Sequence, residues 1–87
     1  MFKNLIKNYV DKLSTEDINF FAVSNNIYLN EVEKKIIYKE IKENWKILLS
    51  DNYYSVLKNI KDKVSLETYF KIENLIKIYR NKYKNYL

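Results

Sequence analysis

The chain has 87 residues, of which 47% are hydrophobic and 31% charged, and its formal net charge is +5 at pH 7. A chain of this length buries enough surface for one modest core, so we expect a single domain over residues 1–87. The absence of Cys and His excludes disulfides and thiolate metal ligands and removes the usual catalytic proton shuttle.

The first segment predicts an amphipathic helix over residues 2–13, because apolar residues recur at steps of three and four up to Leu13. The first ten residues interleave Lys and Asn with apolar residues and do not resemble a secretion signal. No apolar run is long enough to cross a bilayer. We therefore expect a cytoplasmic protein that does not contact a membrane.

A second helix is predicted over residues 15–24. Ser14 suits the N-cap, with Asp17 in the first turn near the positive end of the helix. Asn25 and Asn26 are expected to end it, because Asn tolerates the left-handed backbone found at helix C-termini. The residues expected to face the core are Ile18, Phe21 and Ala22.

The third helix is the longest and is expected to form the spine of the core. A short extended link over residues 27–29 precedes Asn30, and Asn30 with Glu33 resembles a capping box that starts the helix at Glu31. Its apolar stripe runs to Leu49 and includes Trp45, which is predicted to be buried.

Two further helices are predicted in the second half of the chain. The first covers residues 52–63, and Ser65 is placed to cap a last helix that begins at Leu66. No repeat or linker appears, and all the connections are short. The sequence therefore predicts an all-α fold, a compact bundle of about five short helices.

The positive charge is concentrated near the C-terminus, where five cations stand against one anion, Glu73. Cations and tyrosines together suit phosphates and stacked bases. Helix C-termini also favour cations, and tyrosines at these spacings fit an inward stripe. The presence of a single arginine argues against a phosphate-specific site. The candidate nucleic-acid or partner surface comprises Lys71, Lys77, Arg80, Lys82, Tyr83, Lys84 and Tyr86.

Four large aromatic residues fall off the predicted apolar stripes. They are Phe20, Tyr38, Tyr54 and Phe70. Exposed aromatic side chains are typical of protein interfaces, so these positions are the candidate contact surface for a protein partner or for a second copy in a homodimer.

No catalytic site, metal site or cofactor is expected. Glu40 and Glu43 lie one turn apart on the presumed solvent face, and nothing indicates an acid and a base in separate environments. Ser14, Ser50 and Ser65 lack a general base and are better explained as helix caps.

Two runs carry a resemblance to known sequences, KLSTEDINFFAVSNNIYLNEVEKKIIYKEIKENWKILL and VSLETYFKIENLIKIYRNKYKNYL. Together they resemble a family of short uncharacterised helical proteins from low-GC Gram-positive bacteria. The resemblance implies an intracellular bacterial protein with an all-helical fold. It transfers no activity and no site residue. The bias toward Lys, Asn, Ile and Tyr, whose codons are A/T-rich, also indicates an AT-rich genome.

The favoured function is that of a non-enzymatic interaction module that binds another macromolecule. A protein is the favoured class of partner. The alternatives are nucleic-acid binding through the basic C-terminal helix and self-association as a structural protein. The choice among these functions depends on whether the last helix packs on the bundle or projects from it, a question that the sequence leaves open.

Overall fold

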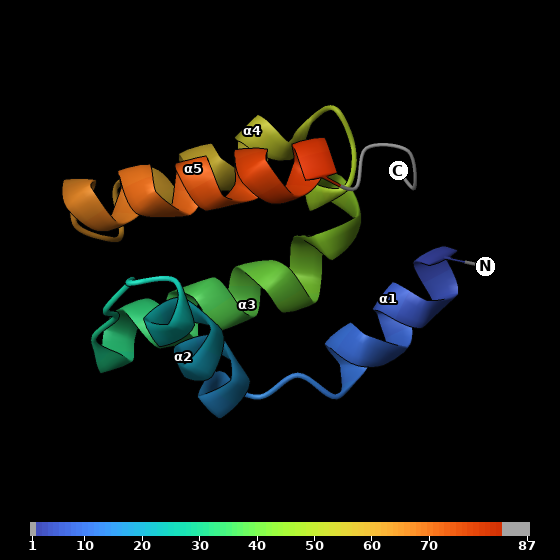
Figure 1. Cartoon of the computed structure of the whole chain (residues 1–87), viewed down its shortest axis with the longest axis horizontal. Coiled ribbons are helices and arrows are strands. Elements are labelled where there is room, and N and C mark those ends of the chain that lie inside the picture. The colour runs from blue at the N-terminus through green and yellow to red at the C-terminus, as the bar shows by residue number, and fades with distance from the viewer. Residues whose placement is uncertain (1, 83–87) are drawn as a thin grey trace.

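Five helices joined by short links make up the computed structural model of the chain, which describes residues 2–82 and the side chains of residues 4–82 (Figure 1). The helices are α1 (Phe2–Asp11), α2 (Thr15–Ser24), α3 (Glu31–Leu48), α4 (Tyr53–Lys61) and α5 (Leu66–Lys82). The described part contains no strand. The predicted all-α bundle is confirmed, and the helix bounds lie within about two residues of those expected.

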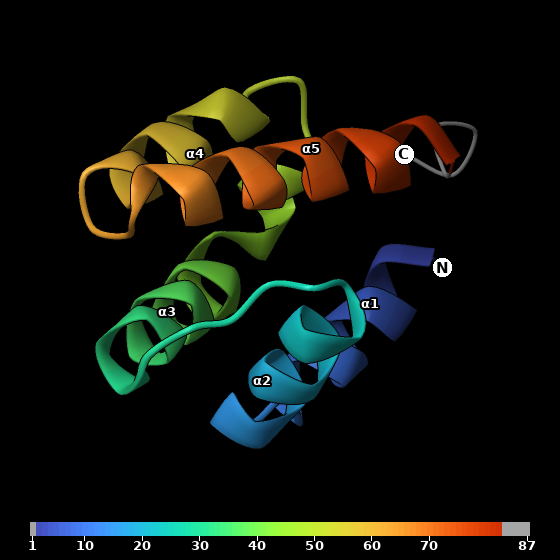
Figure 2. The ribbon, with the colours of Figure 1, turned by 60° about the vertical axis from the view of Figure 1, so that its left-hand side comes forward.

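The helices form two layers. Helices α1, α2 and α3 make up one layer, and α4 and α5 lie side by side as a hairpin in the other (Figures 1 and 2). Helix α3 contacts α1, α2 and α4, as expected for the spine of the core. The radius of gyration is 12.4 Å, close to the roughly 12 Å of a compact domain of this length. Helix α5 packs on the bundle, which answers the question left by the sequence.

The core lies between the two layers. Its central cluster is formed by Ile18, Ile37, Val56 and Ile60, and partly buried residues of α3, of α5 and of the links between helices pack against it. Leu57 on α4 is completely buried. Burying a side chain of this kind contributes about 1.5–3 kcal/mol, and Val56 and Ile60 of the same helix are also buried.

The predicted capping box of Asn30 and Glu33 is present, and Ser14, which was predicted as an N-cap, forms a second box with Asp17. The Ser14 hydroxyl accepts the Asp17 N–H at 3.2 Å, and the Asp17 carboxylate accepts the Ser14 N–H at 2.9 Å. Asn30 and Glu33 exchange the equivalent pair of bonds at 2.8 and 3.0 Å. Each box pairs N–H groups that have no partner within the helix, which explains why the starts of α2 and α3 were predictable.

Helix α2 ends in a Schellman turn, as the two asparagines predicted. Asn26 has a φ of 61°, in the left-handed region that Asn tolerates better than most residues. The Ile27 N–H donates to the Ala22 carbonyl at 2.8 Å, and the Asn26 N–H donates to the Val23 carbonyl at 3.0 Å. The turn places Ile27 in the core, where it is 3% exposed.

Glu33 links the start of α3 to the start of α5. Its side chain is buried, and each carboxylate oxygen accepts one backbone N–H: Oε1 from Asn30 at 3.0 Å and Oε2 from Ser65 at 3.1 Å. Ser65 is the N-cap of α5, because its hydroxyl accepts the Thr68 N–H at 3.1 Å. One carboxylate therefore holds the two helix starts together, and its contact with Ser65 spans 32 residues of sequence.

Several positions predicted to be buried are exposed. Phe21 is 47% exposed, and on α1 Leu5 and Tyr9 are 68% and 72% exposed, although Val10 is buried. Helix α1 packs mainly against α3, so only a narrow part of its apolar stripe is covered. Trp45 is only partly buried. The apolar stripes are wider than the surfaces that neighbouring helices cover.

Helix α3 is kinked, which the apolar pattern did not predict. Asn44 has non-helical angles, with φ −128° and ψ 18°, and Asn is among the poorer helix formers. The last part of the helix turns toward α4 (Figure 1). Glu40, predicted on the solvent face, is half-buried, and its carboxylate accepts the Asn44 side-chain amide at 2.9 Å.

Replacing Glu33 with Gln is expected to lower the free energy of unfolding by about 1–3 kcal/mol. Gln offers one acceptor oxygen, whereas the two oxygens of Glu33 each accept one backbone N–H, from Asn30 and from Ser65. Urea unfolding measured by circular dichroism tests this. Glu31→Gln is the matched control, because Glu31 is exposed and its change is expected to stay within about 0.5 kcal/mol. Equal losses in the two variants would contradict the bridging role of Glu33.

Candidate functional site

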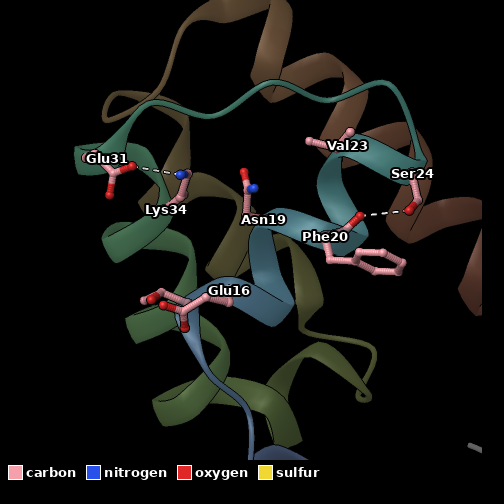
Figure 3. A pocket seen from close by; sticks show the side chains of 8 residues that line it. Glu16, Asn19, Phe20, Val23, Ser24, Glu31 and Lys34 are labelled. Carbon is pink, nitrogen blue, oxygen red and sulfur yellow. Dashed lines mark hydrogen bonds and ion pairs between the residues drawn. The ribbon is translucent and has the colours of Figure 1, made fainter.

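A surface groove lies between α2 and the first turn of α3 (Figure 3). Its volume is about 450 Å³. The lining residues are Thr15, Glu16, Asn19, Phe20, Val23, Ser24, Glu31 and Lys34. Figure 3 shows the link between α2 and α3 passing across one end of it. The two capping boxes fix where both walls begin, so the position of the groove follows from local sequence.

The apolar part of the groove is contributed by α2. Phe20 is 77% exposed and Val23 is 43% exposed. Figure 3 shows the Phe20 ring turned away from α3, at the edge of the groove. The Ser24 hydroxyl donates to the Phe20 carbonyl at 2.8 Å, which holds the last turn of α2. A large aromatic side chain in this position is free to contact a partner.

The polar part of the groove is acidic. The Lys34 ammonium lies 2.8 Å from the Glu31 carboxylate, and this hydrogen bond lowers the pKa of the Glu31 carboxyl below its ordinary value. Glu16 contributes a second carboxylate. Two anions therefore stand against one cation, on a chain whose net charge is positive.

Two hydroxyl side chains, Thr15 and Ser24, line the groove. Its serine hydroxyl donates to a backbone carbonyl, and the chain has neither His nor Cys to serve as a base or a thiol nucleophile. Across residues 2–82, no three His, Cys, Asp or Glu side chains come close enough to hold a metal ion.

None of the helices described over residues 2–82 is long and apolar enough to cross a membrane.

Arg80, a member of the predicted basic surface, is built into the fold. It is half-buried, and its guanidinium donates to the Leu48 carbonyl at the end of α3 at 2.8 Å. The guanidinium also stacks on Tyr53 at 4.3 Å from the ring centroid and lies 3.8 Å from Asp51. Its positive charge therefore stabilises the C-terminus of α3.

Two lysines act in the same way at other helix ends. Lys71 donates to the Asn26 carbonyl just beyond α2 at 3.2 Å, and Lys42 donates to the Asp11 carbonyl at the end of α1 at 2.9 Å. Helices often end in Gly, which this chain lacks. Here Lys42 and Arg80 bind carbonyls at the ends of α1 and α3, and Lys71 binds a carbonyl just beyond the Schellman turn that ends α2.

The remaining members of the basic surface differ in their surroundings. Lys77 lies 3.8 Å from Glu73 and 5.6 Å from the centroid of the Tyr54 ring. The contact between Lys77 and Tyr54 lowers the pKa of the Tyr54 hydroxyl and raises the pKa of Lys77. Lys82 is exposed at the end of α5. The predicted positions Tyr83, Lys84 and Tyr86 lie outside the described residues.

The four aromatic residues predicted as a protein interface lie on four different helices. Phe20, Tyr54 and Phe70 are exposed, as expected. Tyr38 is half-buried and packs against the core, so its prediction as an exposed residue was wrong. Helix α3 lies among three other helices, which cover more of its circumference than one apolar stripe indicates.

A second groove, of about 470 Å³, is lined by residues of α4 and α5 and of the turn between them. Its lining residues are Tyr54, Lys58, Lys61, Asp62 and Tyr69. Lys61 Nζ lies 5.7 Å from the centroid of the Tyr69 ring. Lys58 and Lys61 were not among the residues predicted from the sequence, because the predicted basic surface was confined to the cations of the last helix.

Sequence analysis also missed the groove beside α2. Its carboxylates, Glu16 and Glu31, belong to the first turns of two capped helices, where acidic residues are ordinarily explained by the helix dipole. Only the packing of α2 beside α3 shows that the two anions and Phe20 line one surface.

Comparison of the chain with protein-family models, with curated protein sequences and with solved structures gives no match. The resemblance noted in the sequence stays a prediction.

Replacing Arg80 with Met is expected to lower the free energy of unfolding by about 1–2 kcal/mol, because the Leu48 carbonyl loses its donor and Tyr53 loses a stacked cation. Lys58→Met is the matched control: Lys58 is exposed on α4, and its change is expected within about 0.5 kcal/mol. Thermal and urea unfolding give the comparison. An Arg80→Met protein as stable as the control would show that this contact contributes nothing.

Proposed function

We propose that this chain is a non-enzymatic interaction module that binds another protein through the groove between α2 and α3. The observation that carries the proposal is Phe20, a large aromatic side chain 77% exposed beside a groove of about 450 Å³. Aromatic residues are enriched among the residues that dominate binding energy, and exposed apolar surface beside polar residues is typical of interfaces.

The acidic rim of the groove indicates the chemistry of the partner. Glu16 and Glu31 flank the apolar side chains of Phe20 and Val23, with Lys34 paired to Glu31. A complementary segment has apolar residues on one face and Lys or Arg beside them. Such charge complementarity steers encounter and sets orientation more than it adds affinity.

Photo-crosslinking from position 20 tests this proposal. p-Benzoylphenylalanine replaces Phe20, and in a control protein it replaces Leu66, which is 58% exposed at the start of α5. In a lysate of the source organism we expect one predominant crosslinked protein from position 20 and not from position 66. Crosslinks between two copies of the chain would favour self-association, and identical patterns from both positions would contradict the proposal.

With the crosslinked partner purified, Phe20→Ala is expected to weaken binding about 10- to 30-fold, and Leu66→Ala by less than about threefold. Circular dichroism is expected to show unchanged folding, because both side chains are exposed. A partner bound equally well by both variants would show that α2 is not the contact surface.

Nucleic-acid binding is the second candidate function. The groove beside α4 places Lys58 and Lys61 next to Tyr54, which is 47% exposed, and cations beside an exposed ring suit the phosphates and bases of a single strand. These lysines contribute to the positive charge together with Lys77 on α5.

Fluorescence anisotropy with labelled single- and double-stranded DNA and RNA tests the second candidate. Binding is expected to weaken steeply with salt, and Lys58→Glu with Lys61→Glu is expected to weaken it at least about tenfold. Lys35→Glu with Lys39→Glu is the charge-matched control, because both lysines are exposed on α3. Equal losses in the two double variants would indicate nonspecific attraction to the net charge alone.

A further inference from the structure

The groove beside α4 has an exposed aromatic ring at one end and two lysines along its wall. Tyr54, Lys58 and Lys61 are spaced by four and three residues on α4, so they lie on one face of the helix. A helix rises about 1.5 Å per residue, which places Lys58 roughly 6 Å and Lys61 roughly 10 Å along the axis from Tyr54. An aromatic surface and two positive charges therefore follow one another along the groove.

The Tyr54 ring is held in place by a stack of side chains. Its centroid lies 4.5 Å from that of the Tyr53 ring, with 30° between the two planes. The Arg80 guanidinium lies 4.3 Å from the Tyr53 centroid and is itself bound to the Leu48 carbonyl. The part of Tyr54 that remains exposed lines the groove. A ring that is already fixed loses little freedom when a ligand stacks on it.

The two lysines of the groove are not used by the fold in the way that Arg80 is. Lys58 is exposed and makes no ion pair among the described residues. Lys61 Nζ lies 5.7 Å from the ring centroid of Tyr69, which is buried and also lines the groove. Among the described residues that line the groove, these two lysines stand against one anion, Asp62, so the lining carries a net positive charge.

A ring followed by cations one and two helical turns away suits a ligand that joins a planar base to phosphate. Bases stack on tyrosine, and Lys binds phosphate as a compact positive charge. In a nucleotide the ribose separates the base from its 5′-phosphate by a length similar to one helical turn, which is the spacing between Tyr54 and Lys58. The groove volume of about 470 Å³ lies within the roughly 300–1,000 Å³ of small-molecule sites.

We propose that this groove binds one nucleotide unit, with the base stacked on Tyr54, its phosphate held by Lys58 and the next phosphate held by Lys61. The unit is either a free nucleotide or one residue of a single strand, because both present a base with adjoining phosphates. In the case of a strand, the inference rests on the second candidate function and deepens it. The site is separate from the groove between α2 and α3.

NMR of the full chain with ¹³C-labelled tyrosine rings tests the stacking. AMP is the probe, at low salt. We expect saturable shifts of the Tyr54 ring signals, with a dissociation constant of roughly millimolar. Tyr9 and Tyr28, which are 72% and 69% exposed and do not line the groove, are the internal controls. Shifts of equal size at all three tyrosines would overturn the site.

Substitutions separate the ring from the charges, with affinity measured from the amide shifts of α4 and folding checked by circular dichroism. Tyr54→Leu is expected to weaken AMP binding at least about fivefold, and Tyr54→Phe by less than about twofold, because Phe keeps the ring. Lys58→Gln with Lys61→Gln is expected to weaken AMP binding about five- to tenfold and to leave adenosine binding unchanged. Lys35→Gln with Lys39→Gln, both exposed on α3, is the charge-matched control. Equal affinity of the Leu and Phe variants, or equal losses in the two lysine pairs, would contradict the proposed contacts.

Asp62→Asn tests the phosphate position in a protein whose stacked rings are untouched. Removing this anion is expected to tighten AMP binding about two- to threefold without changing adenosine binding. Glu43→Gln is the matched control, because Glu43 is an exposed carboxylate on α3 and does not line the groove. An equal gain in both variants would show that AMP responds to the net charge alone and would rule out the proposed phosphate position.

Oligonucleotides distinguish a free nucleotide from a strand. Fluorescence anisotropy compares an adenylate decamer with an abasic decamer of the same charge. Recognition of a strand predicts that the adenylate decamer binds at least about fivefold more tightly and that Tyr54→Leu removes this difference. Equal binding of the two decamers, with AMP bound at Tyr54, would assign the site to a free nucleotide.

The same measurements separate failure of the site from failure of the second candidate function. If neither decamer binds and AMP still shifts Tyr54, the candidate function is wrong and the nucleotide site stands. If both decamers bind equally and neither they nor AMP shift Tyr54, the strand is attracted by charge alone and the nucleotide site is refuted.

Discussion

The Glu33 carboxylate is the interaction on which the arrangement of the two layers depends. It closes the capping box at the start of α3 and also accepts the N–H of Ser65, the N-cap of α5. A buried carboxylate is stable only when its oxygens are well paired, and here both pairings come from the backbone. The start of α5 is therefore fixed beside the start of α3. The short helix α4 has to lead the chain from the end of α3 back to that point.

Helix α5 is also tied to α3 at its other end, through Arg80 and the Leu48 carbonyl. The two polar contacts join start to start and end to end, so α5 runs in the same direction as α3, while the apolar side chains between them do not meet fully. A mainly apolar space lined by residues of both helices lies between these two contacts.

Local signals predicted most of the fold, and long-range contacts account for what they missed. The capping residues Ser14 and Asn30 and the left-handed Asn26 act within one helical turn, so spacing alone identified them. The second partner of Glu33 and the carbonyl bound by Arg80 each lie 32 residues away in the sequence, and no periodicity records such a pairing. The groove beside α2 was missed for the same reason, because its walls belong to two separate helices.

The positive charge has a structural explanation that composition concealed. A chain without glycine has lost the residue that most often ends a helix, and here Lys42, Lys71 and Arg80 each donate to a carbonyl at the end of another helix. These cations lie where the helix dipole favours positive charge. A basic residue in this chain is therefore evidence for a nucleic-acid surface only when it does not bind such a carbonyl. Among the described contacts, Lys58 and Lys61 donate to no such carbonyl, whereas the charge of Arg80 stabilises the end of α3.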